Sequence, residues 1–312
     1  MSSWRDRVVL AITALMIGAA AIAFVWLSAL DPVQHRSPSR TATELTGTPL
    51  DWQLNFPLPA SPMQRDLYDF HNFLLAVDVG ICAVVAVLIV FIAWRFRRAR
   101  NPAPQATTHN TALEIAWTIG PVLILTAIAV WSFPILAYVN VTPRTELTLK
   151  VTGRQWYWDY AYPDNGNLQF SSTMVADNEL KPEQRDMRLL AVDNEVVLPV
   201  NTDIRIEITG GDVVHSWSVP SFGVKRDAIP GRINDTWTRI EREGVYHGQC
   251  YELCGRNHAF MPIVVRAVSK TRFQAWLAEA KQQFGQKRDA PPESGRIAQA
   301  SADNSTSGGG PQ

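Results

Sequence analysis

The sequence predicts a two-helix transmembrane hairpin followed by an all-β sandwich outside the membrane. Three observations lead to this prediction. Two long apolar runs occupy residues 73–94 and 115–138. From residue 145 to 268 the pattern changes to short runs of β-branched and aromatic residues separated by turn residues. Late in this region, residues 250–261 hold two cysteines, a histidine and a methionine, which together suit a soft transition metal.

Both apolar runs are long enough to cross the hydrocarbon core, for which about 20 residues suffice. Residues 73–94 contain one charged side chain, Asp78, and residues 115–138 contain none. The loop 95–114 between them has four arginines among its first six residues, and short arginine-rich loops stay in the cytoplasm. The sequence therefore predicts a hairpin over 73–140 whose outer ends face the opposite side. The overall balance of 29 basic and 29 acidic residues, typical of a soluble chain, hides this pattern.

The ends of the chain have a different composition from the hairpin and the sandwich. Residues 1–30 place two arginines before an apolar stretch, which fits either a signal peptide or an N-terminal membrane segment. Residues 31–72 are rich in Pro, Ser and Thr and predict an irregular connector on the outer side. Residues 271–285 have the composition of a helix with one apolar face, and residues 286–312 that of a disordered tail.

The sandwich is predicted to occupy residues 141–270. Turn residues such as the Pro-Asp-Asn-Gly run at 163–166 separate its candidate strands, and the short strands favour antiparallel pairing. The predicted strands are 145–151, 156–162, 195–199, 204–209, 236–240 and 263–268.

The cysteine-containing cluster suggests a metal site with more than one ion. A single cysteine with two histidines and a weak methionine would form a mononuclear copper site. Cys250 and Cys254 provide two thiolates that can each bridge, and His258 provides one imidazole. His215 would supply the second imidazole. Two cysteines at this spacing could instead form a disulfide in an oxidising compartment. The third cysteine, Cys82, lies in an apolar run and is expected to be a small buried hydrophobe.

These motifs resemble a known family over about residues 50–280. The motifs are Gly-Arg-Gln-Trp-Tyr-Trp at 153–158, Asp-Val-Val-His-Ser-Trp at 212–217 and Gln-Cys-Tyr-Glu-Leu-Cys-Gly-Arg-Asn-His-Ala-Phe-Met-Pro at 249–262. They are similar to those of cytochrome c oxidase subunit II, the subunit of bacterial haem–copper oxidases that carries the dinuclear copper centre CuA. The resemblance implies an all-β cupredoxin-like sandwich or barrel, preceded by the two-helix transmembrane hairpin, with the metal ligands on loops at one end.

The resemblance also implies a complete ligand set for two copper ions. The side-chain ligands would be His215, Cys250, Cys254, His258 and Met261, and the backbone carbonyl of Glu252 would be the sixth ligand. The carboxylate of Glu252 is then free for a Mg²⁺ ion shared with subunit I, since Mg²⁺ prefers oxygen ligands. An interfacial glutamate paired with arginine is the alternative.

Trp156 and Glu114 are the predicted functional residues outside the metal cluster. In the family, a tryptophan at the position of Trp156 receives the electron; the alternative is a core aromatic of the second strand, on the same face as Trp158. Arg154 stands where the family often has histidine. Glu114, at the cytoplasmic start of the second helix, would mark the entrance of a proton channel, or it would only complement the helix dipole.

The expected electron donor is cytochrome c. Residues 146–266 contain 17 acidic and 13 basic residues, a modest excess that would steer a basic partner. Asp212, beside the copper histidine, and Asp193 are the candidate docking residues.

By this resemblance, the chain would be an electron-accepting subunit of a redox-driven proton translocase in the bacterial inner membrane, with the β domain on the periplasmic side. Electrons would pass to the haem of subunit I, where O₂ is reduced to water. Further expected partners are subunit III, the lipid bilayer and copper chaperones for assembly, and no nucleic acid is expected. The alternatives are a quinol-oxidase subunit without copper, nitrous oxide reductase and a copper-delivery protein.

Overall fold

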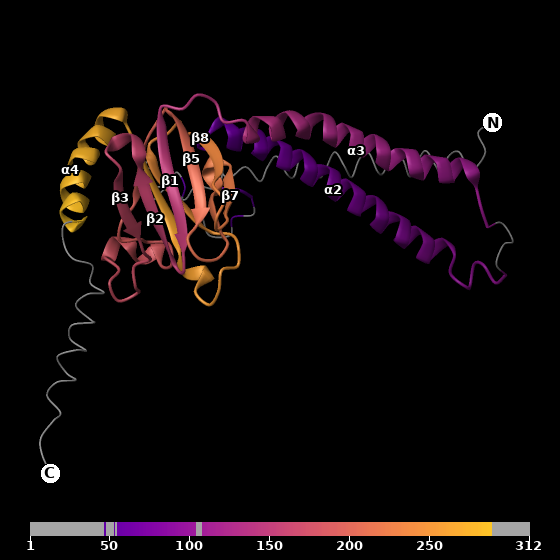
Figure 1. Cartoon of the computed structure of the whole chain (residues 1–312). Helices are drawn as coiled ribbons and strands as arrows, with labels where there is room; N and C mark the ends of the chain where they lie inside the picture. The colour runs from indigo at the N-terminus through magenta and orange to yellow at the C-terminus, as the bar shows by residue number, and fades with distance from the viewer. Residues whose placement is uncertain (1–46, 48–52, 54, 104–107, 289–312) are drawn as a thin grey trace, which may run out of the picture.

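The computed structural model describes residues 47, 53, 55–103 and 108–288. Two long helices extend from one side of a two-layered β domain, and a further helix covers the opposite side (Figure 1). The predictions for residues 1–30, for most of the connector and for the tail from residue 289 onward lie outside the described residues.

Both predicted membrane helices are present and are long and apolar enough to span a bilayer. They are α2 (Pro62–Arg95) and α3 (Thr111–Asn140). The prediction of an irregular connector up to residue 72 is wrong from Pro62 onward. Ser61 caps α2 by accepting a hydrogen bond from the Gln64 backbone N–H, and Pro62 occupies the first turn, where its missing N–H has no consequence. Cys82, predicted to be buried, is exposed on α2 among the described residues.

In the part of the chain that the structure describes, ten strands form two five-stranded sheets. Their orders are β3-β2-β1-β5-β8 and β4-β10-β9-β6-β7. The prediction of purely antiparallel pairing is wrong at two places, because β1 pairs with β5 and β4 with β10 in parallel. The bounds are β1 Leu147–Arg154, β2 Tyr157–Tyr162, β3 Leu168–Ser172, β4 Val196–Pro199, β5 Asp203–Gly210, β6 His215–Val219, β7 Val224–Ala228, β8 Asn234–Arg239, β9 Gly244–Cys250 and β10 Pro262–Val268.

The core of the domain lies between the two sheets. Along β1 and β5, buried and partly exposed residues alternate, as expected for strands with one face on the core. The strand β6 is buried along its whole length. Helix α4 (Lys270–Arg288) closes the core at one side with buried Phe273, Leu277 and Ala280, and it extends beyond the predicted range of 271–285.

The hairpin is attached to the β domain at both helices. At the start of α2, the Ala60 backbone N–H donates to the Ser221 carbonyl at 2.8 Å, and Arg65 forms an ion pair with Glu241. At the end of α3, the Trp237 indole N–H donates to the Tyr138 carbonyl at 3.2 Å. Two separate attachments fix the direction of the domain relative to the helices.

Candidate metal centre

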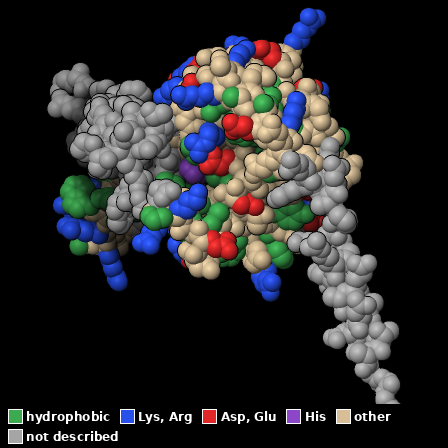
Figure 2. All heavy atoms as spheres, turned by 90° about the vertical axis from the view of Figure 1, so that its left-hand side faces the viewer, with side chains coloured by type: hydrophobic (Ala, Val, Ile, Leu, Met, Phe, Trp, Pro, Cys, Tyr) green, Lys and Arg blue, Asp and Glu red, His purple; other side chains and the backbone are tan. Residues whose placement is uncertain are grey.

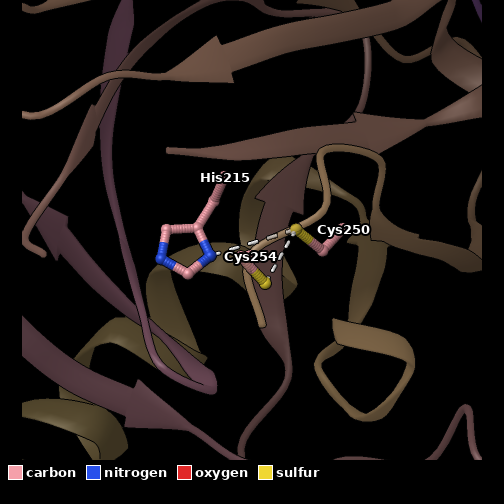
Figure 3. Close-up of side chains that lie close together, drawn as sticks. All are labelled: His215, Cys250 and Cys254. Atoms are coloured by element: carbon pink, nitrogen blue, oxygen red, sulfur yellow. Dashed lines mark hydrogen bonds between the residues drawn. The ribbon is translucent and has the colours of Figure 1, made fainter. Parts of the chain in front are cut away.

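Two neighbouring strands bring the first pair of candidate ligands together. His215 is the first residue of β6 and Cys250 is the last residue of β9. The two strands pair with Trp217 opposite Cys250, and the Tyr251 N–H donates to the Ser216 carbonyl at 3.0 Å. The imidazole and the thiol therefore point toward the same space (Figure 3). The expectation that every ligand lies on a loop is wrong for His215 and Cys250, which lie at the ends of their strands.

The remaining ligands come from the segment between β9 and β10. The two cysteine sulfurs lie 3.9 Å apart, and Cys250 Sγ lies 4.0 Å from His215 Nδ1. Cys254 Sγ lies 3.5 Å from His258 Nδ1 and 3.5 Å from Met261 Sδ. The carbonyl oxygen of Glu252 lies 3.4 Å from Cys250 Sγ. All six predicted ligand groups thus lie close together, with one imidazole beside each cysteine sulfur.

The cluster is buried and its protonation is unusual. Burial opposes ionisation of the Cys250 thiol, but hydrogen bonds with His215 and the backbone hold its pKa below the ordinary value. For His215, burial favours the neutral ring, and the bonds to Cys250 and Asp212 outweigh it and raise the pKa. Burial and the neighbouring Cys250 thiolate raise the pKa of Cys254 to about 12. A bound cation would relieve this competition by stabilising both thiolates.

The donor set fits soft metal ions better than a disulfide. Both cysteines are free, and their sulfurs are too far apart to be bonded. A typical metal–thiolate distance is about 2.3 Å, so one ion can bond both sulfurs across a gap of up to about 4.6 Å. The observed gap of 3.9 Å lies within this limit. Thiolate, imidazole and thioether are ligands preferred by copper.

Asp212 contacts the candidate ligand His215 directly. Its Oδ1 lies 2.8 Å from His215 Nε2 and accepts from the Val213 N–H at 2.6 Å, while Oδ2 accepts from the Gln155 N–H at 2.7 Å. Burial alone would raise the Asp212 pKa, but the bonds from His215 and the two backbone groups lower it. The carboxylate is therefore engaged within the site as well as partly exposed.

Trp156 lies immediately before β2 and packs against the loop of the second cysteine. It is half-buried, whereas Trp158 is fully buried. A Cβ atom placed on Gly255, the residue after Cys254, would lie 3.0 Å from Cζ2 of the Trp156 ring. The ring thus lies in contact with the ligand loop, and the prediction that Trp156 belongs to the second strand is wrong by one residue.

Two residues near the cluster were not predicted from the sequence. The Trp158 indole N–H donates to the Met261 carbonyl at 3.1 Å, and its ring centroid lies 5.9 Å from that of His215. The Gln155 side-chain N–H donates to the Cys254 carbonyl at 2.8 Å. The only sign of these two residues in the sequence is their place in the Gln-Trp-Tyr-Trp run. Their contacts with Cys254 and Met261 could not be predicted, because they join segments far apart in the sequence.

The other predicted residues lie outside the cluster. Asp193 accepts hydrogen bonds from the Thr173 and Asn194 backbone N–H groups, both at 2.7 Å. Glu252 exposes its side chain, and the ion pairs found among the described residues do not include it. Glu114 accepts from the Asn110 N–H at 3.2 Å in the first turn of α3.

Arg154, the residue that departs from the family pattern, pairs with Asp159 at 2.6 Å. Its guanidinium also lies over Gly211, where a Cβ would meet Nη1 at 2.9 Å. The local pairing thus involves an acid of β2, and it neutralises one acidic charge near Trp156.

A β sandwich with a buried thiolate–imidazole cluster at one end and two apolar helices at its start defines a membrane-anchored cupredoxin-like protein. Residues 147–268 match the cytochrome c oxidase subunit II periplasmic domain, and residues 49–135 match the transmembrane domain of the same subunit. The chain belongs to the cytochrome c oxidase subunit II family. It is therefore a membrane protein and a subunit of an oxidoreductase complex.

Curated relatives agree with this assignment. The probable cytochrome c oxidase subunit 2 of Rickettsia felis is 53% identical over 230 residues, which is 74% of this chain and 72% of the relative. Cytochrome c oxidase subunit 2 of Cereibacter sphaeroides is 44% identical over 254 residues, covering 76% and 84%. Among solved structures, the periplasmic domain of subunit II of cytochrome oxidase (CoxB) of Bradyrhizobium japonicum is 52% identical, with a TM-score of 0.43, covering 46% of this chain and 99% of that one.

Proposed function

We propose that this chain accepts electrons one at a time from cytochrome c at a dinuclear copper centre and passes them to the haem of subunit I, where O₂ is reduced to water and protons are pumped. The observation that carries the proposal is the pair of buried thiols 3.9 Å apart, each with its own imidazole. Two copper ions bound there would share one electron over both thiolates.

The protein's own residues hold the donors in place and keep most of them away from water, while His258 is half-buried. His215 and Met261 are 0% and 1% exposed, and Cys250 and Cys254 are 6% and 4% exposed. Strands β6 and β9 fix one half of the cluster, and the segment that returns into β10 carries the other half. A site held this firmly changes little between oxidation states, which favours fast electron transfer.

Trp156 is the residue through which we propose the electron arrives. Its indole is partly exposed to a partner and also touches the loop of Cys254 at Gly255. Aromatic side chains of this kind anchor protein interfaces. Asp212 accepts a hydrogen bond from the backbone N–H of Gln155, the residue before Trp156, and we propose Asp212 and Asp193 as acidic contacts for cytochrome c.

The remaining proposals concern the position of the chain in the oxidase. The exposed carboxylate of Glu252 suits a Mg²⁺ ion shared with subunit I. The arginine-rich turn after α2 favours a cytoplasmic loop, so the β domain would be periplasmic in the bacterial inner membrane. Subunit III and copper chaperones are proposed as further partners. Glu114, at the cytoplasmic start of α3, would mark a proton-channel entrance.

Copper analysis of the full-length protein in detergent tests the central proposal. The loaded protein should contain two copper ions per chain and give a many-line electron paramagnetic resonance (EPR) spectrum from one electron shared by both ions. Cys250→Ser should abolish or convert this spectrum, because one bridging thiolate is lost. Cys82→Ser is the matched control, since Cys82 lies on α2, and it should leave the spectrum unchanged. One copper ion per chain with a single-ion EPR spectrum, or one zinc ion per chain, would contradict the proposal.

A further inference from the structure

A short segment at the end of β1 touches both halves of the candidate metal centre. We name residues 153–156 the ligand clamp. At its start, Gly153 lies beneath the His215 ring, so closely that a Cβ there would be 2.8 Å from the imidazole. At its end, Trp156 packs on Gly255 in the loop of Cys254. His215 belongs to β6, whereas Cys254 lies in the loop after β9 and outside the strand pairing. The clamp therefore contacts both the strand of His215 and the loop of Cys254.

The first half of the clamp acts through Asp212. The Gln155 backbone N–H donates to one carboxylate oxygen at 2.7 Å, and the other oxygen lies 2.8 Å from His215 Nε2. A neutral imidazole has one N–H and one lone pair. When Nε2 carries the proton and donates it to Asp212, the lone pair is on Nδ1, the nitrogen that faces Cys250.

The second half of the clamp acts through the side chain of Gln155. Its amide N–H donates to the Cys254 carbonyl at 2.8 Å. Cys254 lies beyond the last residue of β9, in a stretch where no strand ladder holds the backbone, and Gly255 after it has a φ of +122°. This hydrogen bond therefore connects Cys254 to the turn between β1 and β2, which belong to the other sheet, β3-β2-β1-β5-β8.

We propose that Gln155 is a positioning residue for the copper centre: through its backbone and side chain it sets the position of Cys254 relative to His215, and so determines how evenly the two ions share an electron. The inference rests on the proposed dinuclear centre. The competing interpretation is that Gln155, which is exposed, only contacts cytochrome c. The two can be separated by measurements made with no donor present.

The test uses Gln155→Leu in the full-length, copper-loaded protein. Leucine removes the side-chain donor but keeps the backbone N–H that binds Asp212. We expect two copper ions to remain bound, the EPR hyperfine pattern to become that of unequal sharing, and the reduction potential to shift. Copper loss to a chelator should become about tenfold faster, because groups that orient metal ligands typically contribute 10–100-fold to affinity.

Gln169→Leu is the matched control, because Gln169 is an exposed glutamine of β3 whose amide donates to Asn167 at 3.0 Å. It should behave like the wild type in all three measurements. If Gln155→Leu matches this control and is only reduced more slowly by cytochrome c, Gln155 is a docking contact and the inference is overturned.

Two further outcomes complete the test. A single copper ion in the wild type would overturn the proposed function itself, independently of the clamp. If Gln155→Leu does not fold, Gln155→Glu keeps the shape of the side chain while placing an acceptor against the Cys254 carbonyl, and the same three measurements apply. Loss of the fold in both variants would also overturn the inference, because Gln155 would then be needed for folding.

Discussion

Asp212 shows how one side chain can serve a metal ligand and a protein surface together. Its carboxylate is about one-third exposed, with 31% of the side chain accessible, yet it accepts three hydrogen bonds inside the site. A purely superficial acid would affect only the association of a charged partner. Asp212 should affect both the partner and the metal.

We expect Asp212→Asn to change the copper EPR spectrum with no cytochrome c present, because the amide cannot satisfy His215 Nε2 and the Gln155 N–H in the same geometry. Cytochrome c binding should also weaken, with a flatter dependence on salt. Asp193→Asn is the control, since Asp193 binds only the Thr173 and Asn194 backbone among the described residues. It should change the salt dependence alone. A normal copper spectrum in Asp212→Asn would leave Asp212 as a docking acid only.

Trp156→Phe separates the two roles proposed for this tryptophan. If the indole receives the electron, the variant should be reduced by cytochrome c much more slowly while its affinity and copper spectrum are retained. Stopped-flow reduction and a separate binding measurement give the two quantities. Trp276→Phe, a partly buried tryptophan of α4, controls for the loss of an indole. An unchanged rate with lower thermal stability would instead identify Trp156 as a core aromatic.

The ligands could be predicted from the sequence because most of them are close together in it. Cys250 ends β9, and Cys254, His258 and Met261 follow in the loop after it, so their spacing already implies a shared site. Gln155 and Trp158 could not be assigned in this way. Their contacts with Cys254 and Met261 cross about one hundred residues and depend on how β1 and β2 lie against that loop.

At the level of elements, four strands were not predicted from the sequence: β3, β6, β7 and β9. In β6, Ser216 and Ser218 alternate with Trp217 and Val219, but both serines are buried, so the polar residues do not mark a solvent-exposed face. The two parallel pairings were missed because short strands with tight turns favour antiparallel neighbours. Alternation was also misleading for Trp156, which precedes β2 and does not share the environment of Trp158.

The strand β9 carries a half-buried histidine, His247, that should make the domain sensitive to acid. Burial lowers the pKa of His247 to about 4. In the unfolded chain its pKa is about 6.5, so between these values the unfolded state binds more protons and stability falls as the pH falls. The full effect is up to about 3 kcal/mol, reached below pH 4.

We therefore expect His247→Gln to reduce the loss of stability of the metal-free protein between pH 6.5 and pH 4. Thermal unfolding in detergent at several pH values measures this slope. His109→Gln is the control, because His109 is exposed in the segment before α3. An identical slope in His247→Gln and the wild type would show that the pKa of His247 is the same in the folded and the unfolded state.

Helix α4 should contribute strongly to the stability of the domain. Leu277 is 3% exposed and packs into the same core as the strands. Leu277→Ala should reduce the free energy of unfolding by about 2–4 kcal/mol through lost burial and a cavity. Gln274→Ala, an exposed position of the same helix, should have little effect. Equal stability of the two variants in denaturant titrations would mean that α4 is dispensable.

At the scale of the whole molecule, several surface acids among the described residues are balanced by nearby bases. Glu195 pairs with Arg266, Asp203 with Arg239, and Glu146 with Lys270. On the face that bears α4, acidic and basic side chains are interspersed (Figure 2). Steering of a basic partner should therefore depend on the acids near the metal centre that have no ion pair with Lys or Arg among the described residues, such as Asp212. The modest acidic excess of the domain contributes less than its count suggests.

Glu114 lies at the far end of the hairpin, near the arginine-rich turn and away from the metal centre. Its carboxylate accepts from the Asn110 N–H at the start of α3, which is the ordinary role of an acid in a first helical turn. With this end in the cytoplasm, as proposed, proton uptake by the oxidase would occur on this side, and an acid there would be suited to pass protons to subunit I. The two roles predict different effects on turnover.

If Glu114 serves a proton channel, Glu114→Gln should slow steady-state O₂ consumption by the assembled oxidase while the copper spectrum and reduction by cytochrome c stay normal, because the carboxylate and the metal centre are at opposite ends of the chain. Glu279→Gln, an exposed acid of α4, controls for the loss of a charge. If Glu114 acts only on the helix dipole, the variant should lose about 0.3–1 kcal/mol of stability and keep its turnover. Wild-type O₂ consumption in Glu114→Gln would therefore eliminate the channel role.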